Sequence, residues 1–152
     1  MSGPLIGIVG SAGAYGRWLQ HFFQERMGLE VIGHDPADPA SADETELVQR
    51  ADVLVFSAPI RRTGALIARY AELAAGSEAG RLWLDVTAIK AAPVAAMLAS
   101  RAEVVGLPPM TAPPKTPTLK GRVMVVCEAR LDAWRPWMAS LLAALEAECV
   151  QA

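Results

Sequence analysis

Residues 5–18 read LIGIVGSAGAYGRW, and this stretch decides the fold class. The apolar run Leu5–Val9 predicts a short buried strand, and Tyr15–Arg26 carries apolar residues at helical spacing. The glycine-rich turn between them joins a strand directly to a helix, which is how a βαβ unit begins. The chain is therefore predicted to open with a strand, a tight turn and a helix.

The same alternation of short apolar runs and amphipathic stretches continues along the chain. Further strands are predicted at Leu29–Gly33, Val53–Phe56, Arg81–Val86, Val104–Leu107 and Val123–Cys127, with a last one opening at Cys149 and Val150. Further helices are predicted at Asp43–Arg50, Gly64–Ala75, Ala91–Ser100 and Asp132–Glu148. This order predicts an α/β fold: a Rossmann-like, doubly wound, mostly parallel sheet with helices on both faces. Residues 1–152 form one predicted domain.

Composition excludes several classes of protein. Hydrophobic residues make up 53% of the chain and charged residues 20%, which excludes a disordered polyelectrolyte. A net charge of −2 argues against nucleic-acid binding, and no apolar stretch reaches the ~20 residues of a membrane span. We interpret Cys127 and Cys149 as reduced, buried thiols of a cytoplasmic protein. His21 and His34 are the only histidines, and their spacing to the cysteines predicts no metal site.

The glycine turn is the first candidate for a ligand site. Gly10, Gly13 and Gly16 would let the backbone approach a pyrophosphate, and the N-terminus of the following helix would attract the anion. The usual fingerprint is GxGxxG, whose first position here is Ser11. The predicted cofactor loop comprises Gly10, Ser11, Ala12, Gly13, Ala14, Tyr15 and Gly16. A tight turn without a ligand is the alternative.

Asp35 sharpens this hypothesis, because it follows a predicted strand and lies 19 residues after Gly16. A carboxylate there can accept hydrogen bonds from both hydroxyls of an adenosine ribose and would repel the 2′-phosphate of NADP. No arginine follows closely, so NAD is the predicted cofactor. The alternative is a turn aspartate before Pro36. We interpret His34 as a neighbour of the adenine site or a surface residue, rather than as a catalyst.

Five segments together resemble the nucleotide-binding domain of the prephenate dehydrogenase family, which includes arogenate and cyclohexadienyl dehydrogenases. They read IGIVGSAGAYGRW (6–18), ADVLVFSAPIRRT (51–63), LWLDVTAIKAAP (82–93), VVGLPPM (104–110) and GRVMVVC (121–127). The resemblance implies an oxidoreductase that oxidises prephenate to 4-hydroxyphenylpyruvate with loss of carbon dioxide, in tyrosine biosynthesis. It also implies a helical dimerisation domain. The chain is therefore expected to be an excised or truncated domain of a homodimer acting on prephenate or arogenate.

The resemblance assigns some site residues and puts others in doubt. Ser57, Ala58 and Pro59 match the loop that packs against the cofactor, although a simple end of a strand is the alternative. The family motif D-x-x-S-x-K appears as DVTAIK, with Ala88 at the position of the serine. Thr87 is adjacent and could supply a hydroxyl in a different direction. Lys90 could be a catalyst or a local structural cation.

The largest departure from the family is in the loop after the fifth predicted strand. The family reads G-L-H-P-M, whereas this chain reads GLPPM, with Pro108 at the position of the histidine. Proline has no ionisable group and cannot act as a general base, so the catalytic residues stay unknown. Lys115 could contact a substrate carboxylate or be solvated. The alternatives are a non-catalytic dinucleotide-binding or regulatory module, and a related reductase acting on an imine or a β-hydroxy acid.

Overall fold

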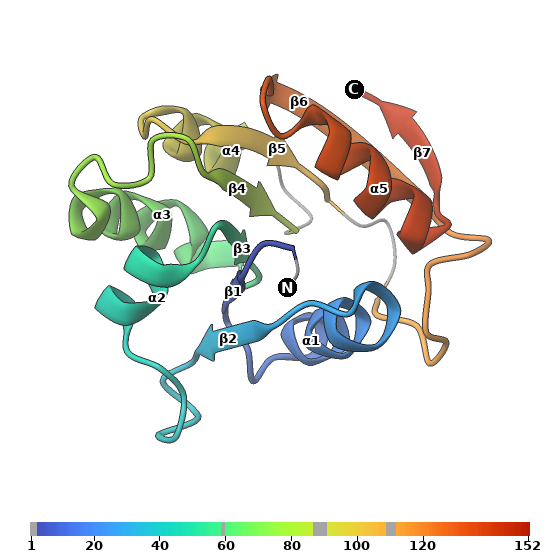
Figure 1. Cartoon of the computed structure of the whole chain (residues 1–152), viewed down its shortest axis with the longest axis horizontal. Helices are drawn as coiled ribbons and strands as arrows, with labels where there is room; N and C mark the ends of the chain where they lie inside the picture. The colour runs from blue at the N-terminus through green and yellow to red at the C-terminus, as the bar shows by residue number, and fades with distance from the viewer. Residues whose placement is uncertain (1–2, 59, 87–90, 109–111) are drawn as a thin grey trace.

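The computed structural model describes residues 3–58, 60–86, 91–108 and 112–152. These residues form a seven-stranded sheet of order β2-β1-β3-β4-β5-β6-β7 (Figure 1). The strands are β1 (Ile6–Val9), β2 (Val31–His34), β3 (Val53–Phe56), β4 (Leu82–Asp85), β5 (Glu103–Gly106), β6 (Val123–Arg130) and β7 (Glu148–Gln151). Neighbouring strands run parallel except β5 and β6. The predicted Rossmann-like fold class is confirmed.

Five helices connect the described strands and cover both faces of the sheet (Figure 1). They are α1 (Ala14–Met27), α2 (Glu44–Arg50), α3 (Ile60–Ala74), α4 (Ala91–Leu98) and α5 (Arg135–Leu145). Apolar side chains of α1 and α5 pack in one core cluster, and those of α2, α3 and α4 pack in the other. The strands of the middle of the sheet are therefore buried on both faces, which is why they read as continuous apolar runs.

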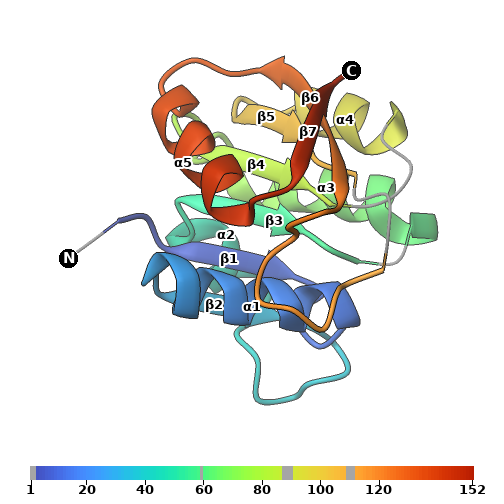
Figure 2. The same cartoon turned by 90° about the vertical axis from the view of Figure 1, so that its right-hand side faces the viewer.

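The sheet is not uniformly parallel, because β6 pairs antiparallel with β5. The connection between them contains no helix among its described residues, so the chain returns without a right-handed crossover. Segment 112–122, orange in Figure 2, runs past α1 before it enters β6. The last predicted strand is confirmed as β7, which pairs parallel with β6.

The start of α5 differs from the prediction for a reason that lies outside the segment. Both carboxylate oxygens of Glu103 accept hydrogen bonds from the backbone N–H groups of Asp132, Ala133 and Trp134, at 2.6–3.1 Å. These N–H groups are thereby satisfied before the first helical turn, and α5 begins at Arg135 instead of Asp132. The capping group comes from β5, 29–31 residues away, and no local pattern could indicate it.

The interpretation of the cysteines as buried was wrong. Cys149 is exposed and Cys127 is half-buried, and both thiols are free. Cys149 lies on β7, the edge strand whose residues are all exposed, so the sheet covers it on one side only. No helix among the described residues is long and apolar enough to cross a membrane.

The strand order places a crevice at one point of the sheet. From β1 the chain passes to β2 on one side and later to β3 on the other, so the connections after β1 and β3 diverge to opposite faces. In doubly wound sheets, ligands bind outside the carboxyl ends of the strands at this point. The glycine turn follows β1, and Ser57 and Ala58 follow β3.

Candidate functional site

The backbone of the glycine turn is held close to its neighbours, and two of its glycines are required there. Gly10 has a φ of +90°, and a Cβ on it would lie 2.8 Å from the carbonyl oxygen of Ser57. A Cβ on Gly16 would lie only 2.1 Å from the carbonyl oxygen of Gly10. Gly13 has ordinary extended geometry and caps α1 without a side-chain hydrogen bond. The turn therefore leaves open the space that side chains would otherwise fill.

Asp35 lies beside this turn, at the carboxyl end of β2. Its Oδ2 accepts a hydrogen bond from the backbone N–H of Ala12 at 2.9 Å, and its Oδ1 accepts one from Ala37 at 2.9 Å. Each carboxylate oxygen has a second lone pair that can accept a further hydrogen bond. Asp35 is therefore a turn aspartate, as the alternative interpretation had it, because it accepts a hydrogen bond from Ala37 two residues on. This bond leaves the carboxylate able to accept hydrogen bonds from a ligand as well.

A cavity of about 340 Å³ joins these parts. It is bounded by the turns after β1, β2 and β3 and by residues of α2 and α3. Of the predicted cofactor residues it is lined by Gly10, Gly13, Asp35, Ser57 and Ala58, and His34 and Glu44 line it too. Three segments far apart in the sequence thus meet in one concave site, which is the usual form of a small-molecule site.

The other residues of the predicted loop lie around this cavity. Ser11 is buried and packs closely on Gly33. A Cβ added to Gly33 would lie 2.4 Å from the Cβ of Ser11. Ser11 and Ala12 line a neighbouring depression together with Arg17. Ala14 is exposed and Tyr15 is half-buried in the first turn of α1.

Several of the predicted positions lie outside the described residues. These are Pro59 of the cofactor loop and Thr87, Ala88 and Lys90 of the family motif. The Asp85 that opens that motif is fully buried at the end of β4. Pro108 is buried just beyond the end of β5, at the same edge of the sheet as the cavity. Pro108, the residue that stands where the family motif has its histidine, has no ionisable group.

Sequence reasoning missed a polar cluster of which two members, Glu44 and His34, line the cavity. The carboxylate of Glu44, on α2, lies 2.7 Å from the guanidinium of Arg69 and 4.0 Å from Nε2 of His34. The other ring nitrogen of His34, Nδ1, lies 2.8 Å from the carbonyl oxygen of Ala42. Glu44 lies in the first turn of α2 with other acidic residues, which is common at helix N-termini, so its sequence context does not indicate a ligand site.

Tyr70 lies behind this cluster and is fully buried. Its hydroxyl lies beside the Glu44 carboxylate, although no hydrogen bond of full geometry to it is found among the described residues. Burial raises the pKa of the Tyr70 phenol strongly, and the neighbouring Glu44 carboxylate raises this pKa further. Both effects disfavour the phenolate, so the folded protein keeps this tyrosine neutral at pH values where an exposed tyrosine ionises.

Because the pKa of Tyr70 is raised, we expect the free energy of unfolding to decrease at alkaline pH. Above a pH of about 10 the unfolded chain releases the tyrosine proton while the folded protein retains it, so unfolding becomes more favourable. The Tyr70→Phe variant cannot show this effect. Urea unfolding gives the free energy of unfolding of both proteins at pH 8 and at pH 11. Between these two pH values the wild type should lose about 1.4 kcal/mol more of it than the variant. A constant difference between the two pH values would contradict the raised pKa.

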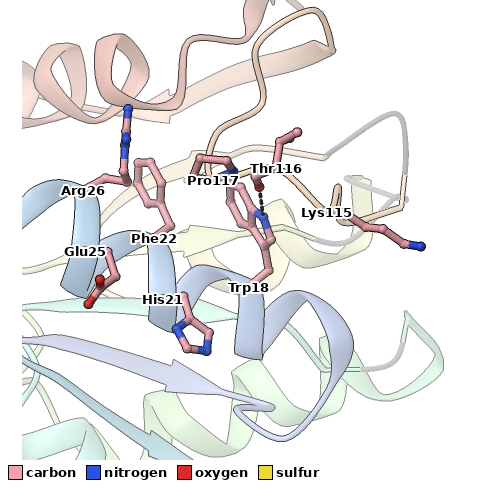
Figure 3. Close-up of a pocket in the computed structure, with 8 residues that line it drawn as sticks. All are labelled: Trp18, His21, Phe22, Glu25, Arg26, Lys115, Thr116 and Pro117. Atoms are coloured by element: carbon pink, nitrogen blue, oxygen red, sulfur yellow. Dashed lines mark hydrogen bonds between the residues drawn. The ribbon is translucent and has the colours of Figure 1, made fainter.

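A second cavity, of about 300 Å³, lies on the flank of α1 and not at the carboxyl edge of the sheet (Figure 3). Trp18 and Phe22 form its floor, and its rim includes Pro117, Lys115 and His21. The indole N–H of Trp18 donates a hydrogen bond to the carbonyl oxygen of Thr116 at 2.9 Å, which holds the loop against the helix.

Neither Lys115 nor His21, which line this second cavity, lines the first one. Lys115 is exposed, and Figure 3 shows its side chain extending away from α1. His21 is exposed on the helix surface. The cavity contains no residue of the glycine turn and no residue at the end of a strand. The geometry therefore favours the solvated alternative for Lys115.

Comparison with known proteins gives structural relatives only. No protein-family model matches the chain, and no curated protein sequence does. Prephenate dehydrogenase from A. aeolicus, solved with hydroxyphenyl propionate and NAD+, aligns over 100% of this chain and 60% of its own, with a TM-score of 0.78 and 13% identity. Synechocystis arogenate dehydrogenase aligns over 97% and 59%, with a TM-score of 0.77 and 16% identity.

A reductase of another class is nearly as similar. Plasmodium falciparum pyrroline carboxylate reductase, solved with NADP bound, aligns over 100% of this chain and 58% of its own, with a TM-score of 0.74 and 12% identity. The chain thus spans somewhat less than two thirds of each of these proteins. Together these comparisons establish that the chain has the Rossmann-like fold shared by these nucleotide-dependent dehydrogenases and reductases.

Proposed function

We propose that this chain is the NAD-binding domain of a dehydrogenase. The observation that carries the proposal is the meeting of the glycine turn and the Asp35 carboxylate in one cavity at the point where the connections of the sheet diverge. The proposed cofactor-binding residues are Gly10, Ser11, Ala12, Gly13, Ala14, Tyr15, Gly16, Asp35, Ser57, Ala58 and Pro59.

The residues present fit a dinucleotide. The positions of Gly10 and Gly16 leave room for a pyrophosphate beside the backbone, and the N-terminus of the 14-residue helix α1 carries no acidic residue in its first turn to repel the anion. Asp35 would accept hydrogen bonds from the ribose hydroxyls with its remaining lone pairs. NAD, when bound, would supply the acceptor of a hydride from the substrate.

The choice of NAD over NADP tests the assignment of Asp35. We expect the chain to bind NAD more tightly than NADP by about tenfold or more. In NADP the 2′-phosphate would be repelled by the Asp35 carboxylate, which would also lose the hydrogen bond from the 2′-hydroxyl. Isothermal titration calorimetry with both dinucleotides measures this ratio directly. Equal affinities, or tighter binding of NADP, would overturn the proposed role of Asp35.

The finer proposal is a prephenate or arogenate dehydrogenase of aromatic amino acid biosynthesis, acting as a cytoplasmic homodimer. It is supported by the five segments that resemble this family and by the similarity to two structures of such enzymes. The helical domain through which the family dimerises would provide the remainder of the substrate site. In this chain, the family positions for catalysis are Ala88 and Pro108, with Thr87 and Lys90 nearby.

The second candidate is a non-catalytic dinucleotide-binding or regulatory module. The observation that favours it is Pro108, a buried residue without an ionisable group, where the family carries a histidine. Formation of NADH from NAD with prephenate or arogenate distinguishes the two candidates. The dehydrogenase requires substrate-dependent NADH formation by the protein at its native length, and the module requires NAD binding without it.

If the protein is a dehydrogenase impaired by Pro108, placing a histidine at this position should increase its activity. General acid–base groups contribute about 10²–10⁴-fold to enzymatic rates, so Pro108→His should raise kcat with prephenate by up to that factor. The pH profile of kcat should also gain a limb at ~6.5, the ordinary pKa of histidine. Pro117→His, at an exposed proline of the same loop, is the matched control and should leave kcat unchanged. A wild-type enzyme that already shows the limb would refute the view that this site is impaired.

A further inference from the structure

Two hydrogen-bond acceptors lie close together on His34 and Glu44, which both line the cavity. A carbonyl oxygen can only accept, so the contact of 2.8 Å with Ala42 places a proton on Nδ1 of His34. In the neutral ring, Nε2 is then an acceptor. It lies 4.0 Å from Oε2 of Glu44, which is an acceptor too. Two acceptors at this separation cannot satisfy each other.

A single group that donates two hydrogen bonds would satisfy both atoms. A nitrogen at about 2.9 Å from each acceptor can lie beside a pair of atoms 4.0 Å apart. An exocyclic amino group supplies two N–H donors from one nitrogen. A carbonyl oxygen at the same place would instead meet two lone pairs and leave both acceptors without a donor.

The position of this acceptor pair relates it to one part of a dinucleotide. The glycine turn and Asp35, which would hold the pyrophosphate and the ribose, line this cavity. His34, Glu44 and the apolar side chain of Leu66 line the same cavity and remain for the base. The cavity thus offers an apolar contact for a ring and two acceptors for a substituent on it.

Resting on the proposed function, we propose that Glu44 and His34 select adenine as the base of the dinucleotide by accepting both hydrogens of its 6-amino group. Nicotinamide hypoxanthine dinucleotide differs from NAD at this position, where it carries a carbonyl oxygen. The site therefore discriminates between two dinucleotides that share the same pyrophosphate, ribose and nicotinamide.

Arg69 positions the Glu44 carboxylate without contacting the base. Its guanidinium binds Oε1 of Glu44 at 2.7 Å, and its own side chain is 63% exposed. Oε1 is thereby occupied, and Oε2 is the oxygen that faces His34. Arg69→Gln removes the ion pair and keeps the acceptor, so this variant should retain most of the preference for adenine.

The test is calorimetric titration of the chain with NAD and with the hypoxanthine analogue in mildly alkaline buffer. The wild type should bind NAD about tenfold more tightly than the analogue, because the analogue leaves both acceptors without a donor. Glu44→Ala should reduce this ratio to below about threefold. Glu46→Gln is the matched control, because Glu46 lies on the same helix, pairs with Arg50 and does not line the cavity.

Each outcome separates the two proposals. If both dinucleotides bind the wild type equally, the selection of adenine is overturned while NAD binding stands. Binding of neither overturns the proposed function and the selection with it. If Glu44→Ala is less stable, His34→Phe, which keeps a ring but has no acceptor, provides the second variant, and thermal unfolding identifies a folded sample. A ratio that stays near tenfold in both folded variants overturns the roles of Glu44 and His34.

Discussion

Replacement of Gly16 by alanine is expected to lower the free energy of unfolding by about 3 kcal/mol and to abolish measurable NAD binding. The added Cβ would lie 2.1 Å from the carbonyl oxygen of Gly10 and 2.9 Å from Cα of Ser11. Both are backbone atoms, so no side chain can rotate away to make room. Either α1 moves off the sheet or the glycine turn shifts, and the second response displaces the groups proposed to hold the pyrophosphate. Urea unfolding and calorimetry measure the two effects.

Gly64→Ala is the matched control for this prediction. Gly64 also lies in the N-terminal part of a helix that follows a strand, α3, and a Cβ there would meet no atom within 4 Å. Alanine in an unobstructed helix position is more stable than glycine by about 0.5–1 kcal/mol. The two substitutions should therefore have opposite signs. Similar stability in both variants would show that α1 does not pack on the turn as described.

Asp35→Ala is expected to weaken NAD binding about 100-fold and to leave NADP binding unchanged or improved. Two hydrogen bonds from ribose hydroxyls to a carboxylate contribute about 1.5–3 kcal/mol each, and their loss is only partly compensated by water. The variant would also lose the bonds from the N–H groups of Ala12 and Ala37, so the turn should become less rigid. Calorimetric titration of both dinucleotides gives the change in preference.

Asp38→Ala is the control, because Asp38 lies in the same loop, is exposed, and bonds to the N–H of Ala40 in the way Asp35 bonds to Ala37. It does not line the cavity. This variant removes one charge and one turn bond without removing a proposed ligand. Equal losses of NAD affinity in the two variants would attribute the effect to general electrostatics and contradict a contact with the ribose.

Local signals in the sequence predicted much of the fold. The buried strands β1, β3 and β4 are continuous apolar runs, and α1 has apolar residues at helical spacing, so their periods are visible within a few residues. The glycine turn was predictable because a positive φ at Gly10 and a close approach at Gly16 exclude other residues. The place of Asp35 beside the turn was predictable because its spacing from the turn follows from one helix and one strand, and its role toward a cofactor stays a prediction.

Only the tertiary structure decided which distant groups meet. The antiparallel pairing of β6, the capping of α5 by Glu103 and the approach of Glu44 to His34 each join residues from different elements. Local periodicity reports which side of an element is buried, but not which element packs against it. The partner depends on the direction in which the chain crosses the sheet, and that choice is made by the packing of the whole domain. For this protein, the sequence by itself determined most of the strands and helices and the glycine turn, whereas tertiary packing decided the pairing of β6 and which side chains line the cavity beside that turn.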